Sequence, residues 1–68
     1  MQTLTRLKKH RLRRMLTQHE LAKLSGVSRT TIARLEAART RAYPTTSRKL
    51  AKALRTRPED LCEVKLVV

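Results

Sequence analysis

Residues Leu16 to Glu36 read LTQHELAKLSGVSRTTIARLE and contain the clearest local structural signals of the chain. Its first half can form a short helix capped by Thr17, with Glu20 at the third helical position as a capping box requires. Gly26 is the only glycine in the chain and stands where this helix must stop, because glycine readily takes the left-handed conformation that ends many helices. Ser28 can then cap a second helix. The stretch therefore predicts two capped helices joined by a tight turn.

Apolar residues recur at helical spacing through the rest of the chain. We predict helices at residues 4–15, 18–25, 29–38 and 44–55, and a fifth, short helix opened by Pro58. The side chains expected to face inward are Leu4, Leu7, Leu12, Met15, Leu21, Ala22, Leu24, Val27, Ile32, Leu35, Ser47, Leu50, Ala51, Leu54, Leu61 and Cys62. Strand alternation and repeats are absent from the sequence. The prediction is an all-α chain: one compact domain of five helices over residues 1–63, followed by an apolar tail at 64–68.

Composition limits what such a chain can do. Sixty-eight residues make one small domain with a thin core, in which a deep catalytic cleft is not expected. The net charge of +12 points to a polyanionic partner, either nucleic acid or an anionic membrane. Tyr43 is the only aromatic residue, which argues against single-strand binding by base stacking. Double-stranded DNA is the better match. The acids Glu59, Asp60 and Glu63 gather at the carboxy-terminal end, which we expect to face away from phosphates.

Several other functions are not supported. Cys62 is the only cysteine, so no disulfide can form within the chain, and no apolar run approaches the length of a membrane span. We therefore expect a cytoplasmic protein without membrane contact. His10 and His19 have no cysteine partner nearby, so neither zinc nor another cofactor is expected. Tyr43 could imitate a recombinase nucleophile, but the sequence around it offers no catalytic cluster, so packing or phosphate contact is the better interpretation. No enzyme is predicted.

The residues resemble a known family, the phage repressor and Cro-like, or Xre-type, helix-turn-helix DNA-binding domains. The resemblance aligns without a gap over residues 4–62. It rests on LTQxELA at 16–22, GVSxxxIxxLE at 26–36, LAxAL at 50–54 and PEDL at 58–61. It implies a compact lambda-repressor-like fold and binding to duplex DNA.

The second helix of the pair is the expected recognition helix. Val27, Ile32 and Leu35 are expected to face the core, which leaves a polar outer side whose first turn can enter the major groove. Arg29 and Arg34 can each donate two hydrogen bonds to guanine O6 and N7. The predicted base contacts are Ser28, Arg29, Thr30 and Arg34, and the resemblance implies the same positions. The alternative is that these side chains form an ordinary solvated helix face.

Contacts to the DNA backbone are expected on either side of that helix. Gln18 begins the preceding helix, where free backbone N–H groups attract anions, although it could simply fill that position. The resemblance also implies backbone contact by the loop that follows the recognition helix. The predicted phosphate contacts are Gln18, Arg39, Thr40 and Arg41.

The resemblance further implies a salt bridge between Arg11 and Glu36, for which an exposed, weak pair is the alternative. It also shows where the chain departs from the family. Met15, Ala38 and Arg55 replace glycines that the family often has, and Arg57 replaces a serine that usually caps the last helix. Ala42 stands at a frequent proline position, so Pro44 must start the fourth helix.

Three functions fit these observations. The first is a sequence-specific transcriptional regulator, with repression as its expected action, that binds DNA as a homodimer and takes no small-molecule ligand. Its dimer contacts are predicted at Leu61, Val64, Leu66 and Val67. The second is an antitoxin or adaptor that binds a partner protein. The third is a nonspecific architectural or recombinase-associated DNA binder.

Overall fold

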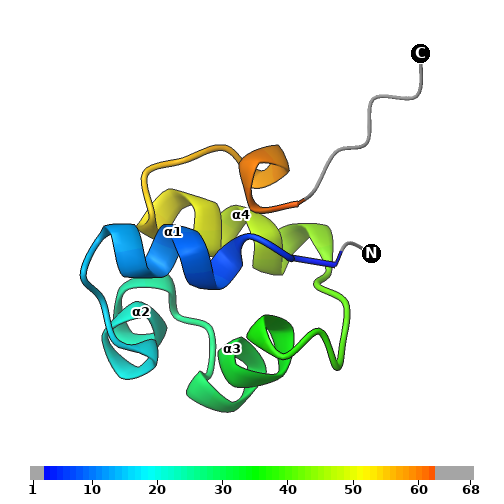
Figure 1. Cartoon of the computed structure of the whole chain (residues 1–68), viewed down its shortest axis with the longest axis horizontal. Coiled ribbons are helices and arrows are strands. Elements are labelled where there is room, and N and C mark those ends of the chain that lie inside the picture. The colour runs from blue at the N-terminus through cyan, green and yellow to red at the C-terminus, as the bar shows by residue number, and fades with distance from the viewer. Residues whose placement is uncertain (1–2, 63–68) are drawn as a thin grey trace.

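The computed structural model describes residues 3–62, which form four α-helices and one 3-10 helix. These are α1 (Leu7–Arg13), α2 (Gln18–Ser25), α3 (Arg29–Glu36), α4 (Pro44–Ala53) and η1 (Pro58–Leu61). Helix α2 packs against both α3 and α4, and η1 packs against α4. In Figure 1, α2 and α3 lie on one side of α1 and α4, while η1 lies on the other. The all-α prediction holds for this part of the chain, but the expected fifth helix is a short 3-10 helix.

Three helices end two residues earlier than predicted, for one shared reason. Helices α1, α3 and α4 each end two residues before a non-glycine residue with a left-handed backbone. These residues are Met15 (φ 55°), Ala38 (φ 56°) and Arg55 (φ 53°). A residue with positive φ cannot continue a right-handed helix. The three positions where the family often has glycine are therefore the positions where the backbone favours it.

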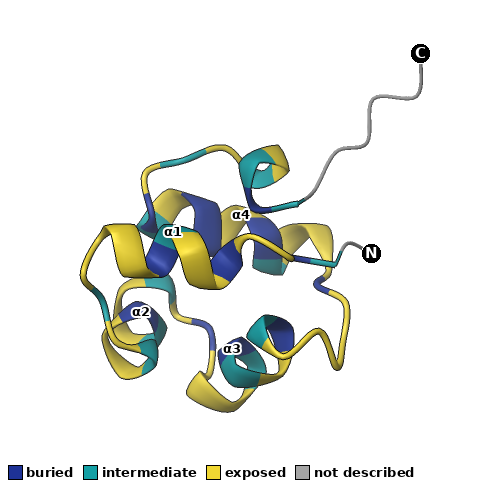
Figure 2. Cartoon of the chain, in the orientation of Figure 1, coloured by how far each residue is buried: buried dark blue, intermediate teal, exposed yellow. Residues whose placement is uncertain are grey.

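The core is a single apolar cluster between the helices (Figure 2). Its fully or nearly fully buried members are Leu4, Leu7, Leu21, Val27, Ile32, Leu35, Ala42, Leu50, Ala51, Leu54 and Leu61. Most of the predicted inward residues are among them.

The prediction was wrong for three apolar side chains. Leu12, Met15 and Leu24 are 55%, 89% and 62% exposed. In α1 the buried position one turn after Leu7 belongs to Arg11, so Leu12 points to solvent. Met15 lies beyond the end of that helix. Apolar periodicity placed Leu12 inside because it cannot recognise that the neighbouring Arg11 is buried.

The carboxy-terminal 3-10 helix closes the core. The Asp60 carboxylate accepts hydrogen bonds from the Thr56 hydroxyl at 2.9 Å and the Arg57 backbone N–H at 3.2 Å. Asp60 thus supplies the cap that Arg57 lacks, and these two bonds lower the pKa of its carboxyl. Leu61 is completely buried, and its backbone oxygen accepts from the N–H of Arg6 at 3.0 Å.

This placement bears on the dimer contacts expected from the sequence. The Leu61 side chain packs inside its own domain and offers no surface to a second copy. The other three expected contacts, Val64, Leu66 and Val67, lie outside the described residues.

Candidate nucleic-acid interface

Local hydrogen bonds fix where α2 begins and ends. The Thr17 hydroxyl accepts from the backbone N–H of Glu20, and the Glu20 carboxylate accepts from the N–H of Thr17, both at 3.0 Å. These bonds form the predicted capping box and lower the pKa of Glu20. Gly26 follows the helix with φ 74°, and its N–H donates to the oxygen of Ala22 at 2.9 Å. The turn between the two helices therefore depends on the one residue type that takes this backbone without strain.

Helix α3 is oriented by its own cap and by its buried side. The Ser28 hydroxyl accepts from the Thr31 N–H at 3.2 Å and donates to the Thr31 Oγ1 at 2.7 Å. Ile32 and Leu35 are completely or almost completely buried. With one side anchored in the core, the opposite side of the helix must face solvent.

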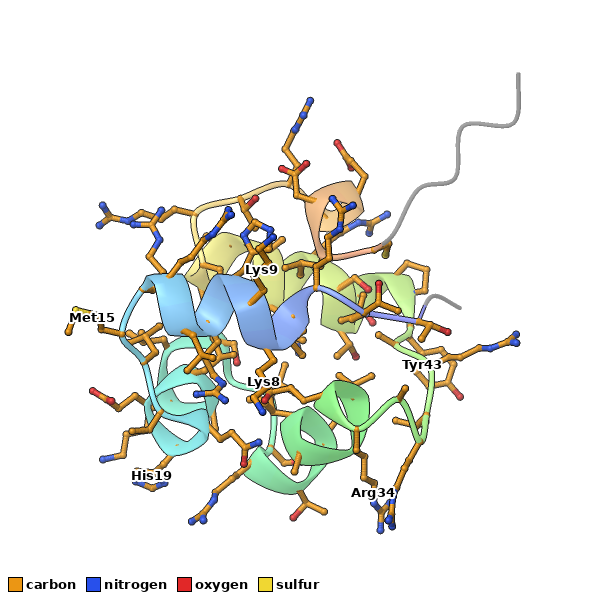
Figure 3. All side chains as sticks on the ribbon, viewed as in Figure 1. Lys8, Lys9, Met15, His19, Arg34 and Tyr43 are labelled. Carbon is orange, nitrogen blue, oxygen red and sulfur yellow. The ribbon has the colours of Figure 1, made fainter. Side chains whose placement is uncertain are left out.

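That outer side carries the side chains expected to contact bases. Ser28, Arg29, Thr30 and Arg34 are all exposed, and the first turn of α3 contains no acidic residue. Figure 3 shows Arg34 extending away from the body of the domain, on the side opposite η1. His19 of α2 extends in the same general direction. Within residues 3–62, the acidic 3-10 helix therefore lies far from the outer face of α3.

A buried ion pair sets the position of α3 against α1. Arg11 Nε donates to Glu36 Oε2 at 2.7 Å and Nη2 donates to Oε1 at 2.9 Å. The side chains are only 9% and 5% exposed, so this is the buried form of the expected pair. The hydrogen bond to Glu36 raises the pKa of Arg11 further above its already high ordinary value.

The pair extends into a small network at the start of α2. Arg11 Nη1 donates to the backbone oxygen of Leu16 at 2.7 Å. Gln18 Nε2 donates to Glu36 Oε1 at 3.3 Å. One amide N–H of Gln18 is thus engaged inside the domain. The side chain has two such donors, so the second can still face a ligand.

Two surface hollows divide the expected DNA contacts into two groups. The first hollow, about 270 Å³ in volume, brings Arg34 together with Thr40 and Arg41. The second, about 630 Å³, contains Gln18 and Arg29. Arg39 is exposed and lines neither hollow, although its N–H donates to the backbone oxygen of Arg34 at 2.9 Å. The two groups lie towards opposite ends of α3.

The first hollow also contains Thr31 and Thr46, which the sequence did not single out, and Tyr43, for which packing or phosphate contact was expected. Thr31, Tyr43 and Thr46 line it beside the arginines, and Tyr43 is exposed (Figure 3). All three carry hydroxyl groups that can donate to phosphate oxygens. The available signal was the run of hydroxyl residues around Pro44, which starts α4 as predicted. Only contact with Arg34 and Arg41 in space shows that these hydroxyls belong to the same surface.

The fold and this surface define a small helix-turn-helix DNA-binding domain. A helix-turn-helix family model matches residues 7–61. The chain belongs to that family, the Xre-type or phage repressor-like helix-turn-helix proteins, and is a DNA-binding regulator of this class. No significant match was found among curated proteins or among solved structures.

Over residues 3–62, no helix combines the length and apolar character needed to cross a membrane. The same part of the chain holds no cluster of three or more His, Cys, Asp and Glu side chains suited to a metal ion. Cys62 is half-buried, and this burial raises the pKa of its thiol, which lowers its reactivity.

Proposed function

We propose that the chain is a sequence-specific regulator that reads duplex DNA in the major groove with α3 and acts as a repressor. The outer face of α3 carries this proposal, because Arg29, Thr30 and Arg34 are exposed there while Ile32 and Leu35 hold the opposite side in the core. A helix fixed in this way presents donors in a constant register. Such a register is what direct recognition of base edges requires.

The side chains around α3 have two different roles in this proposal. Ser28, Arg29, Thr30 and Arg34 contact bases, and the two arginines prefer guanine. Arg39, Thr40 and Arg41 grip phosphates and position the domain without reading sequence. Thr40 and Arg41 share one hollow with Tyr43 and Thr46, which adds the hydroxyls of Tyr43 and Thr46 to the phosphate contacts. Gln18 binds a phosphate through the amide N–H that does not bond Glu36.

The network of Arg11, Glu36 and Gln18 links the two roles. Gln18 begins α2 and Glu36 ends α3, so their hydrogen bond ties a phosphate contact to the base-reading helix. Arg11 holds Glu36 from α1. A domain whose phosphate contacts are rigidly placed relative to its reading helix discriminates between registers on the duplex.

We further propose that the regulator binds as a homodimer through Val64, Leu66 and Val67. Two copies related by a two-fold axis would read half-sites about one helical turn of DNA apart. Repression then follows if the bound dimer blocks other proteins from the same duplex.

Selection of bound sequences from a pool of random duplexes tests this function. The proposal expects a consensus with two inverted half-sites that contain guanines. Enrichment of single, unpaired half-sites would contradict the homodimer. Recovery of no consensus would contradict sequence reading and favour a nonspecific architectural role.

A further inference from the structure

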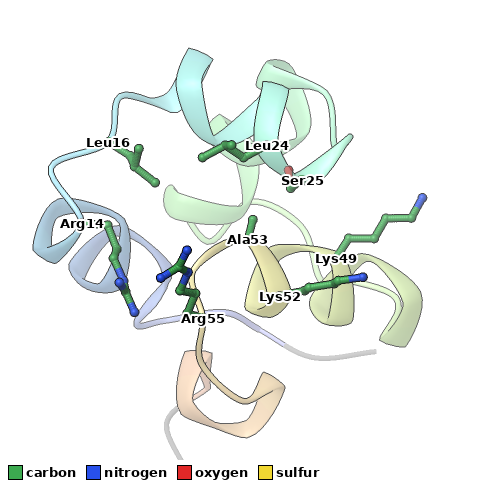
Figure 4. A pocket seen from close by; sticks show the side chains of 8 residues that line it. All are labelled: Arg14, Leu16, Leu24, Ser25, Lys49, Lys52, Ala53 and Arg55. Carbon is green, nitrogen blue, oxygen red and sulfur yellow. The ribbon is translucent and has the colours of Figure 1, made fainter.

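A second basic surface lies away from the expected DNA contacts. It is a groove of about 640 Å³ between the end of α1, the end of α2 and the second half of α4 (Figure 4). Its rim carries four cations, Arg14, Lys49, Lys52 and Arg55. Leu16, Leu24 and Ala53 supply its apolar part. None of the residues that line it is among the predicted DNA contacts.

One of the four cations, Arg14, is held in place by a hydrogen bond. The Nε of Arg14 donates to the backbone oxygen of Leu54 at 3.1 Å, which holds the guanidinium at the rim and leaves its other N–H groups available. Leu24 is 62% exposed and so presents apolar surface to the groove. Leu16 and Leu24 also line a neighbouring hollow, whose other residues are Glu20 and Lys23.

We infer that this groove binds an acidic amphipathic helix of a partner protein. No carboxylate lines the groove, so four cations surround an apolar floor without a counter-charge. An occupant with carboxylates along its edges and leucine-like side chains on one face would satisfy both features. This is the arrangement by which an amphipathic helix binds in an apolar groove.

A second copy of the chain fits the groove poorly. Each acid in residues 3–62 already has a partner within the chain. Glu36 is buried against Arg11, and Glu20 caps Thr17. Glu59 and Asp60 both lie within 4 Å of the Arg57 guanidinium. Two copies with a net charge of +12 each would bring like charges together at this rim.

Duplex DNA also fits the groove poorly. Phosphates would satisfy the cations, but a sugar-phosphate backbone offers much less apolar surface to cover Leu24 and Leu16 than an amphipathic helix does. The expected DNA contacts cluster instead around α3, in hollows that share only Leu16 with this groove. We therefore assign the two surfaces to two different partners.

Selection of binders from a library of random peptides against the full chain tests the inference. We expect the enriched peptides to carry Glu or Asp together with Leu, Ile or Phe at helical spacing. Enrichment of basic or purely polar peptides, or of none, would overturn the proposal.

Two matched pairs of variants then locate the binding site. Lys49→Ala/Lys52→Ala should weaken the enriched peptide about fivefold or more, whereas Lys8→Ala/Lys9→Ala, which removes the same charge from exposed positions on α1, should change it less than about twofold. Leu24→Gln should weaken it about tenfold, and Leu12→Gln, at a leucine that is 55% exposed and lies outside the groove, should not. Circular dichroism of each variant verifies that the helices remain.

Two results would show that the inference is wrong. Equal losses within each pair would mean that the peptide responds to overall charge or overall apolar surface. The second result concerns DNA. If Lys49→Ala/Lys52→Ala weakens binding of a random duplex as much as binding of the peptide, the groove is a phosphate site. We expect this variant to retain its affinity for DNA within about twofold, since rim charges in a separate groove contribute only long-range attraction.

Discussion

Arg11 and Glu36 stand 25 positions apart in the sequence and form a two-bond ion pair almost closed to solvent. The pair joins α1 to the last residue of α3, and Gln18 adds a link from the start of α2. One charged network therefore sets the relative placement of all three helices around the expected DNA surface.

Removal of the carboxylate from this network should destabilise the fold strongly. Glu36→Gln would leave the Arg11 guanidinium buried without its counter-charge, at a cost of about 3–5 kcal/mol in the free energy of unfolding. Urea denaturation measures the loss. The control is Glu59→Gln, which removes a carboxylate from an exposed ion pair with Arg57 and should cost less than about 1 kcal/mol. Similar losses in the two variants would mean that burial of the first pair has little energetic effect.

The left-handed residues after α1, α3 and α4 offer a route to a more stable protein. Ala38→Gly should stabilise by roughly 1 kcal/mol, because relief of the left-handed strain exceeds the extra entropy of glycine in the unfolded chain. For a domain of this size, that corresponds to a rise in Tm of about 4–8 °C. Ala37 is the matched control, since its φ is −82° and Ala37→Gly should lower Tm. If both changes lower Tm alike, the left-handed backbone at Ala38 is not a source of strain that glycine relieves.

Ser47 is another position where the native residue is not the most stable one. Its hydroxyl is buried inside α4 and has no hydrogen-bond partner among the described residues. Ser47→Ala removes the unsatisfied group and improves helix propensity, so it should stabilise by about 1 kcal/mol. Ser25→Ala is the contrast, because the Ser25 hydroxyl donates to Leu21 O at 2.7 Å and accepts from Val27 N at 3.2 Å. Thermal unfolding should move in opposite directions in the two variants.

Stability should fall in acid because two capping carboxylates have lowered pKa values. Hydrogen bonds from Thr17 hold down the pKa of Glu20, and bonds from Thr56 and Arg57 hold down that of Asp60. The unfolded chain therefore binds more protons than the folded chain between the folded and unfolded pKa values. This stabilisation is complete above the unfolded pKa values near 4 and is lost as pH falls through the lower folded ones.

Asp60→Asn tests this dependence. We expect a shallower fall in the free energy of unfolding between neutral pH and pH 3 than in the native chain, measured by urea denaturation at each pH. Glu59→Gln should leave the fall in the free energy of unfolding over this pH range closer to that of the native chain. If the free energy of unfolding of Asp60→Asn falls with pH as steeply as in the native chain, the hydrogen bonds that Asp60 accepts do not contribute to the loss of stability in acid.

Caps and turns that depend only on residues close together in the sequence could be predicted from the sequence. The Thr17 box, the turn at Gly26 and the Ser28 cap all depend on neighbours within four positions, and all are present. The start of α4 at Pro44 follows from the same kind of information. Ion pairing between Arg11 and Glu36 required the family resemblance, because helical spacing alone does not bring residues 25 apart together.

The leucines that were wrongly expected in the core each lie beside a polar residue that takes the inward position. Leu12 and Leu24 have apolar side chains at helical spacing, yet the inward positions beside them belong to Arg11 and Ser25, whose polar atoms are hydrogen-bonded. An apolar pattern assigns the inside to leucine and cannot anticipate a satisfied polar neighbour. The basic groove lined by Leu24 was missed for the same reason, because it depends on contacts between α2 and α4 that no local pattern encodes.

Arginines that contact bases and arginines that contact phosphates should respond differently to mutation. Binding of Arg29→Ala and Arg41→Ala to a selected duplex and to a random duplex, measured over a range of salt concentrations, distinguishes the two roles. Arg29→Ala should lose about 1–3 kcal/mol on the selected duplex and much less on the random one. Arg41→Ala should weaken both duplexes alike and reduce the salt dependence of binding. Equal losses of Arg29→Ala on the two duplexes would contradict the claim that α3 reads bases.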